Sequence, residues 1–237
     1  MPGFRQGVRD NLPIAPSVAA YGAVLGMLAA QKSMAALDVM ALNVFLFAGS
    51  AQFVLVDMWN APLPVLEMAL AATVVNLRYL LIGASLKDLF AGQGIWRRLG
   101  IMHFAADENW AMTMVAARKG QGDVHHLLGG GMLLMLFWSA GTMSGMFLGG
   151  LIPDPKVWAL DFAFTAVFTA LAVSLWQGRQ DLVPWLVAVA ASVLTERFVP
   201  GKWYILAGGL SGALCAALLP GPDRRESRDI TKTGEAA

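Results

Sequence analysis

The chain has 237 residues, of which 57% are hydrophobic and only 14% are charged, and its formal net charge is +1. Soluble domains carry about 25% charged residues, so the composition excludes an ordinary soluble domain. The balanced net charge gives no overall basic character that would suggest nucleic acid binding. A single cysteine, Cys215, excludes a disulfide framework within the chain and a cysteine-based zinc site. We therefore expect an all-α integral membrane protein.

Apolar stretches long enough to cross a membrane, which requires about 20 residues, recur along the chain. One of these stretches, residues 182–195, is short and reaches span length only when Glu196 and Arg197 are included. Interfacial anchors are expected near span ends, and four tryptophans lie there: Trp59, Trp158, Trp176 and Trp203. We predict about seven transmembrane helices, over residues 14–30, 39–56, 63–86, 127–152, 157–176, 182–195 and 203–219.

The segment covering residues 99–117 is ambiguous because Asp107 and Glu108 lie at its centre. It is compatible with an eighth span, a re-entrant element or an interfacial helix. With seven spans, one side of the membrane holds eleven Lys and Arg residues against four, whereas with eight spans the split is nine to six. The positive-inside rule then favours seven spans and a cytoplasmic C-terminus, although Arg5 and Arg9 favour the opposite orientation.

The sequence contains a candidate internal repeat with an offset of 123 residues. Residues 21–45, YGAVLGMLAAQKSMAALDVMALNVF, align with residues 144–168, SGMFLGGLIPDPKVWALDFAFTAVF, and share a glycine pair and an Ala-Leu-Asp triplet. Units of three spans would be inverted relative to each other, and units of four would be parallel. We predict three-helix units in an inverted arrangement, which is common in secondary transporters that bind substrate near the midplane.

We interpret residues 1–237 as a single membrane domain. The predicted parts are a first repeat (1–86), an acidic segment (99–117), a second repeat (127–200), a final helix (203–219) and a polar cytoplasmic tail (220–237). Glycines spaced by four residues place small side chains on one helix face and predict close helix packing. They are Gly22 and Gly26, Gly141, Gly145 and Gly149, and Gly208 and Gly212.

Three polar stretches carry the candidate substrate-binding residues. In the first, FAGSAQF at residues 47–53, Gly49 and Ser50 weaken a helix and Gln52 places an amide at membrane depth. Either the helix breaks here and lines a cavity, or it continues and Gln52 bonds a neighbour. The other two stretches are NLRYLLIGASL (76–86), with Asn76 and Arg78, and DEN (107–109), with Asp107 and Glu108.

Arg78 is the sixteenth of 24 residues in the third predicted span, so it lies roughly 12 Å from the nearer end of that span. Its side chain covers roughly half that distance, and a central arginine costs about 2.5–3.5 kcal/mol. A partner is therefore expected, and Asp107 or Glu108 is the candidate if residues 99–117 enter the bundle. Either this pair is permanent and structural, or the guanidinium binds a substrate carboxylate.

In this order, FAGSAQF, NLRYLLIGASL and DENWAM resemble the AzlC family, the large subunits of two-component branched-chain amino acid exporters. Tyr79 stands where many members have histidine, so a proton role is not carried over to that position. The resemblance covers residues 3–219 and implies a bundle of membrane helices in the bacterial plasma membrane. It further implies export of branched-chain amino acids, driven by the proton motive force, and a small hydrophobic AzlD-type partner subunit.

The sequence lacks HExxH, GxSxG and any Cys/His metal set, so we expect no enzyme activity, cofactor or metal. Its polar residues cluster in a few places, which favours a discrete site over a channel lining. A channel or transporter for another small zwitterionic or polar solute, and an accessory membrane subunit, are the alternatives. Away from the candidate site, His125 and His126 are expected to be solvated beside Asp123, and Asp38 and Asp161 to cap helices.

Overall fold

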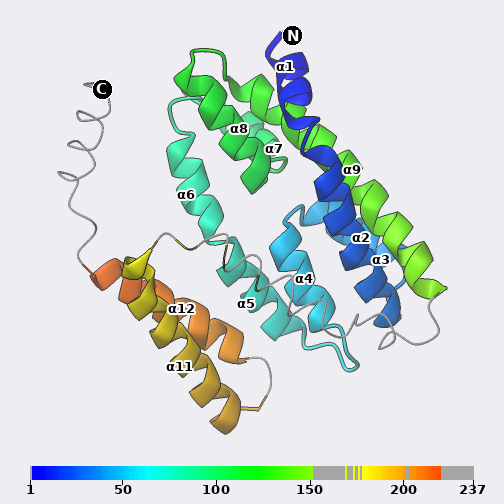
Figure 1. Ribbon diagram of the computed structural model, residues 1–237, viewed down its shortest axis with the longest axis vertical. Coiled ribbons are helices and arrows are strands. Elements are labelled where there is room, and N and C mark those ends of the chain that lie inside the picture. Colours follow the sequence, from blue (N-terminus) through cyan, green and yellow to red (C-terminus); the bar gives the residue numbers. More distant parts are fainter. Residues whose placement is uncertain are drawn as a thin grey trace. The chain divides into compact units, whose positions relative to one another are not determined.

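The computed structural model of the chain consists of helices and their connections, with no strand among the residues it describes (Figure 1). These are residues 2–151, 178–200 and 203–219, together with positions 169, 173 and 176. The chain divides into two compact units, Met1–Thr169 and Ala170–Ala237. The predicted all-α class is confirmed, and most of the fifth predicted span and the whole tail (220–237) lie outside the described residues.

The frame of the first unit consists of α1 (Pro2–Asn11), α2 (Ala15–Gln31) and α9 (Val124–Gly150). α1 and α2 meet at an angle of 64°, and both pack against α9. Glycine allows the close approach of α2 and α9. A Cβ atom added to Gly26 would collide with the carbonyl oxygen of Thr142, and one added to Gly145 with that of Ala23. The packing role predicted for the spaced glycines is thereby confirmed.

α2 and α9 run parallel and lie side by side (Figure 1). Their facing pairs advance together along both helices: Ala19 with Gly141, Ala23 with Gly145 and Met27 with Gly149. Under the 123-residue offset, these two stretches are equivalent, and equivalent helices of an inverted pair would run antiparallel. The parallel course does not fit the predicted inverted arrangement. Residues 152–168, which complete the second copy of the aligned segment, lie outside the described part of the chain.

α3 (Ala36–Phe45) and α4 (Gly49–Asp57) form a re-entrant hairpin rather than a crossing. Both ends of the hairpin lie beside the C-terminal end of α2. α3 begins shortly after α2, and the end of α4 returns to it, as the hydrogen bond from Lys32 Nζ to the Asp57 carbonyl oxygen at 2.9 Å shows. The arms converge near the tip, where Gln52 Nε2 donates to the Leu42 carbonyl oxygen at 3.0 Å. Each arm rises only about 15 Å, which is half of the roughly 30 Å hydrocarbon core.

The prediction of a span over residues 39–56 is therefore wrong. Apolar length cannot separate a crossing from a hairpin of the same length, because both bury an equally apolar run. The break lies at residues 46–48, where Ala48 has an extended backbone with φ −150° and ψ 90°. A break beside Gly49 and Ser50 was one of the two predicted alternatives and is confirmed. Asp38 caps α3 as expected, since its Oδ2 accepts from the Ala35 N–H at 3.0 Å.

The third predicted span is a 21-residue apolar helix, Val65–Ser85, which is interrupted at Leu77. The interruption divides it into α5 (Val65–Asn76) and α6 (Arg78–Ser85). This helix and the 27-residue α9 are each long and apolar enough to cross a membrane. The bent pair of α1 and α2 is a third candidate if it forms one span.

α7 (Ile95–Met102) and α8 (Asp107–Arg118) form a second re-entrant hairpin, which enters from the opposite end of the unit. Its outer ends lie at the N-terminal end of α9, where Arg97 Nη2 contacts His125 Nε2 at 3.0 Å. At its tip, the Phe104 carbonyl oxygen occupies the space where a Cβ atom of Gly131 would lie. The turn between α7 and α8 excludes an eighth span over residues 99–117, and the approach of the tip to Gly131 favours the re-entrant alternative.

The second unit contains a short 3-10 turn at Arg179–Asp181 and two helices, α11 (Leu182–Phe198) and α12 (Trp203–Leu218). The two helices pack antiparallel: Gly208 faces the Ser192 hydroxyl, and Gly212 faces Ala188. These glycines again serve packing, as predicted. α11 includes Glu196 and Arg197, which the sixth predicted span needed to reach span length.

Candidate functional site

The tips of the two hairpins approach each other along α9 from opposite ends of the unit. The tip of α3–α4 lies at Trp138, whose ring would contact a Cβ atom added to Gly49 at 3.0 Å. The tip of α7–α8 lies at Gly131, against the Phe104 carbonyl. Seven residues of helix separate these two levels, which corresponds to about 10 Å. The N-termini of α4 and α8 begin at the two tips, and both therefore direct the positive end of a helix dipole into this region.

A buried hydrogen-bond network fixes the first tip. Trp138 Nε1 donates both to Gln52 Oε1 at 2.8 Å and to Asn43 Oδ1 at 3.1 Å. Asn43 Nδ2 in turn donates to Thr142 Oγ1 at 2.7 Å. The Asn43, Gln52 and Thr142 side chains have no exposed surface. Gln52, a predicted substrate-binding residue, thus has both ends of its amide engaged in holding the hairpin closed on α9.

The N-terminus of α4 has no side-chain cap, so the first-turn N–H groups of this helix lack an intrahelical partner. The Ser50 hydroxyl oxygen is buried beside it, without a hydrogen-bond partner among the described residues. The Tyr21 hydroxyl oxygen is likewise buried and has no hydrogen-bond partner among the described residues. The Tyr21 ring packs against Phe53, with centroids 5.0 Å apart, and against Trp138 at 6.1 Å. Tyr21 was not predicted, because only tertiary packing brings α2 against the hairpin.

The second tip contains the predicted ion pair. Arg78 Nη1 donates to Asp107 Oδ2 at 2.6 Å, and the guanidinium also lies 5.4 Å from the centre of the Tyr79 ring. This confirms a partner for Arg78 in the acidic segment and identifies it as Asp107. Arg78 Nε and the nearby Asn76 Oδ1 are buried atoms with no hydrogen-bond partner in the described structure.

Each residue of the DEN stretch has a different environment. Asn109 is fully buried and ties the tip to α9, because its Nδ2 donates to the Leu127 carbonyl at 2.8 Å and to the Phe104 carbonyl at 3.0 Å. Asp107 pairs with Arg78. Glu108 forms no ion pair with any described residue, although it interacts electrostatically with Arg78 and Asp107 and with the Tyr21 hydroxyl. It is therefore the acid of this tip that has no ion-pair contact among the described residues.

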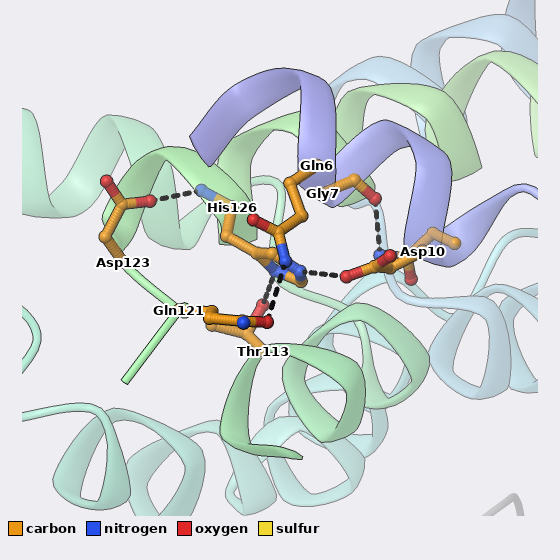
Figure 2. A network of polar contacts seen from close by, with 8 residues as sticks. Gln6, Gly7, Asp10, Thr113, Gln121, Asp123 and His126 are labelled. Carbon is orange, nitrogen blue, oxygen red and sulfur yellow. Dashed lines mark hydrogen bonds and ion pairs between the residues drawn. The ribbon is translucent and has the colours of Figure 1, made fainter. Parts of the chain in front are cut away.

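A second polar cluster joins α1, α8 and α9 (Figure 2). His126 Nε2 lies 3.0 Å from Asp10 Oδ2, and His126 Nδ1 lies 2.9 Å from Thr113 Oγ1. The expectation that His126 is solvated in a loop is wrong, because its side chain has no exposed surface. The chain continues as a helix through this position, and α1 covers it. Sequence spacing does not reveal the contact, since Asp10 is 116 residues away.

Asp123 caps the N-terminus of α9, with its Oδ1 accepting from the His126 N–H at 2.8 Å. Burial opposes ionisation of this carboxyl, but the hydrogen bond from His126 and the contact with the His125 ring outweigh it and lower the pKa of Asp123. His125, unlike His126, is partly exposed, as expected for a solvated histidine.

The AzlC protein family model matches residues 13–152, which is more than half of the chain. The chain belongs to the AzlC family. A branched-chain amino acid transport protein AzlC of Bacillus subtilis is 23% identical over 204 residues, covering 86% of this chain and 80% of the relative. The inner membrane protein YgaZ of Escherichia coli is 26% identical over 222 residues, covering 91% and 90%. No solved structure matches the chain.

Other AzlC-like relatives are known only as membrane proteins. One from Helicobacter pylori strain J99 is 22% identical over 211 residues, covering 87% of this chain and 92% of the relative. The names of the relatives and the apolar helices agree that this AzlC-family chain is a membrane protein. The matched region includes α2, both hairpins and α9, so the candidate site lies entirely within the family's shared part.

Proposed function

We propose that this AzlC-family protein exports branched-chain amino acids and binds them between the tips of its two re-entrant hairpins. The observation that supports the proposal is that the N-termini of α4 and α8 both point into the region between the tips, beside the unpaired acid Glu108. An amino acid is a zwitterion, so its site needs donors for the carboxylate and an acceptor for the ammonium group. Both kinds of group occur in this region.

The carboxylate pole is the N-terminus of α4. Its unpaired first-turn N–H groups and its helix dipole favour an anion. The Ser50 and Tyr21 hydroxyls are buried and have no partner among the described residues, so each has a hydrogen bond to offer. The adjacent Tyr21 and Phe53 rings, with centroids 5.0 Å apart, make the surroundings of this pole apolar.

The ammonium pole is Glu108. Arg78 and Asp107 neutralise each other across their 2.6 Å contact, so an ionised Glu108 leaves this tip with one negative charge. The ammonium group of a substrate balances that charge. In this arrangement Arg78 maintains the tip, and the α4 N-terminus, rather than the guanidinium, receives the substrate carboxylate.

The opposed hairpins suit alternating access. Each enters from one end of the unit and covers the site from that side, so displacing one tip exposes the site to that side alone. Transporters built from broken helices bind substrate at the same kind of half-helix terminus near the midplane.

The name of the B. subtilis relative supports branched-chain amino acid transport, the resemblance to the AzlC family supports the location, the driving force and the partner, and the distribution of Lys and Arg supports the side of the C-terminus. We propose the bacterial plasma membrane as the location, with the C-terminus in the cytoplasm, and the proton motive force as the driving force. We further propose a small AzlD-type membrane subunit as the partner.

Efflux from intact cells tests the function. Cells loaded with dipeptides containing leucine, isoleucine or valine are followed with this chain, an AzlD-type subunit, both or neither. We expect faster efflux of all three amino acids when both are present. Efflux that is the same in all four strains would show that the chain is not an exporter of these amino acids.

A matched pair of variants tests the site. Glu108→Gln removes the proposed ammonium partner, and Glu196→Gln makes the same change at an exposed position of α11. We expect at least a tenfold loss of efflux for Glu108→Gln at equal amounts of protein in the membrane, because a charge-assisted hydrogen bond is worth about 1.5–3 kcal/mol. Equal efflux for both variants would refute the ammonium site.

A further inference from the structure

We propose that His126 is a proton-binding site, paired with the partly exposed Asp10 carboxylate and linked through Thr113 to the hairpin that carries Glu108 (Figure 2). The imidazole has no exposed surface, yet each ring nitrogen has a polar partner within 3.0 Å. The partners come from two other helices, Asp10 from α1 and Thr113 from α8.

The cluster can hold the ring in either protonation state without moving a heavy atom. In the neutral ring, Nε2–H donates to the Asp10 carboxylate, and Nδ1 accepts from the Thr113 hydroxyl. A proton taken from solution binds to Nδ1, and the hydroxyl, which is both donor and acceptor, rotates to accept from Nδ1–H. The Asp10 carboxylate then balances the positive charge of the imidazolium.

Asp10 is the partly exposed member of the cluster. Its side chain is 33% exposed, whereas the ring beneath it is completely buried. α1 is held firmly in this position, since a Cβ atom added to Gly7 would collide with the carbonyl oxygen of His126. Conversely, a Cβ atom added to Gly129 on α9 would collide with the carbonyl oxygen of Phe4 on α1.

The other charged groups near His126 point away from the ring. On α9 itself, Asp123 accepts from the backbone N–H of His126 and contacts the neighbouring His125 ring. On α7, Arg97 contacts His125 and not His126. The remaining charges of α1 and of the end of α8 are exposed at the surface: Arg5, Arg9, Arg118 and Lys119. Asp10 is therefore the carboxylate that faces the ring.

Thr113 transmits the protonation state to the hairpin. It lies on α8 five residues after Glu108, which corresponds to about 8 Å along the helix. Protonation reverses the direction of the hydrogen bond between Thr113 and the ring. The helix that positions Glu108 thus experiences the charge of a histidine that is outside the substrate site.

NMR of the full chain in lipid nanodiscs, with isotope-labelled histidine, tests the proton site without any transport measurement. The chain has only three histidines, and His126→Gln assigns the signal. We expect a neutral Nε2–H tautomer at high pH and a doubly protonated ring at lower pH. Asp10→Asn should weaken proton binding at His126, because it removes an opposite charge. Thr113→Val should weaken it as well.

Either of two NMR results would overturn the proton site: a His126 ring that stays neutral while His103 and His125 titrate, or a midpoint that Asp10→Asn does not move. Efflux measured as a function of pH tests the link to α8. We expect His126→Gln to flatten the pH profile and His125→Gln, on the adjacent and partly exposed ring, to leave it unchanged. Equal profiles for the two variants would overturn the link while leaving the export proposal intact.

Discussion

The Arg78–Asp107 pair gives the sharpest test of how the site is built. Arg78→Gln leaves the Asp107 carboxylate without a partner at membrane depth, and Asp107→Asn does the reverse. Insertion scales assign about 2.5–3.5 kcal/mol to an isolated central charge. The side chains are 29% and 46% exposed, so roughly half of that cost, about 1–2 kcal/mol, is expected after screening.

The double variant Arg78→Gln/Asp107→Asn contains neither charge. It loses only the net stability of the pair, which is about 0–1 kcal/mol for a partly exposed ion pair. We therefore expect the double variant to be more stable than Arg78→Gln, with a coupling energy of about 1 kcal/mol or more. Thermal unfolding in detergent measures this cycle, and Arg97→Gln, which removes an exposed arginine of α7, is the control. A double variant destabilised by the sum of the single changes would refute the structural pairing.

Arg78→Lys separates this pairing from direct substrate recognition. The contact with Asp107 uses one nitrogen, so an ammonium group can replace it, whereas bidentate binding of a carboxylate requires the guanidinium. We expect the affinity for leucine to change less than about threefold, because the change removes no proposed contact with the substrate. A loss of tenfold or more in a folded variant would place the substrate carboxylate on Arg78.

Three further changes test the packing around the site, each measured by thermal unfolding. Gly145→Ala places a Cβ atom against the Ala23 carbonyl oxygen and should lower the stability of the fold by about 1–3 kcal/mol. The control, Gly150→Ala, meets open space and should raise the stability by up to about 1 kcal/mol through helix propensity. Equal effects of the two changes would contradict the close packing. Trp138→Phe leaves two buried amide oxygens without their donor and should cost about 1–3 kcal/mol, and unchanged stability would show that the network does not hold the tip. Asp123→Ala should cost about 1 kcal/mol at pH 7, and Asp123→Asn much less. The pKa of Asp123 is lowered in the fold. The stability contributed by its ionised carboxylate is therefore fully present above the pKa of the unfolded chain, about 3.9, and is lost as the pH falls through the lower pKa of the folded protein. A cost of Asp123→Ala that is the same at low pH and pH 7 would contradict this linkage.

Several features could be predicted from local sequence because their physical causes are local. Low charge and long apolar runs indicate a membrane protein in any fold, and glycines four residues apart mark a helix face that can approach another backbone. The FAGSAQF, NLRYLLIGASL and DENWAM stretches identified the family. Arg78 at membrane depth required a partner, and the acidic segment contained the candidates.

The hairpins and their partners depended on contacts that sequence spacing does not encode. A hydropathy scan treats residues 39–56 as one span, since it registers that a segment is apolar and not whether the chain turns back at residues 46–48. The same limitation applies to His126, which lies beside a polar loop in the sequence but is covered by α1 in the fold. Tyr21 is unremarkable in an apolar helix until the hairpin places Phe53 against it.

By itself, the sequence determined that this chain lies in a membrane, which family it belongs to and that Arg78 must be paired, because hydrophobicity and the cost of a buried charge act residue by residue. Only the tertiary structure decided that the tips of two half-length hairpins approach each other along α9, that Asp107 rather than Glu108 holds Arg78, and that Gln52 supports the tip. Those outcomes depend on which helix surfaces pack closely, and the close parallel packing of α2 on α9 through small residues is a property of the assembled fold.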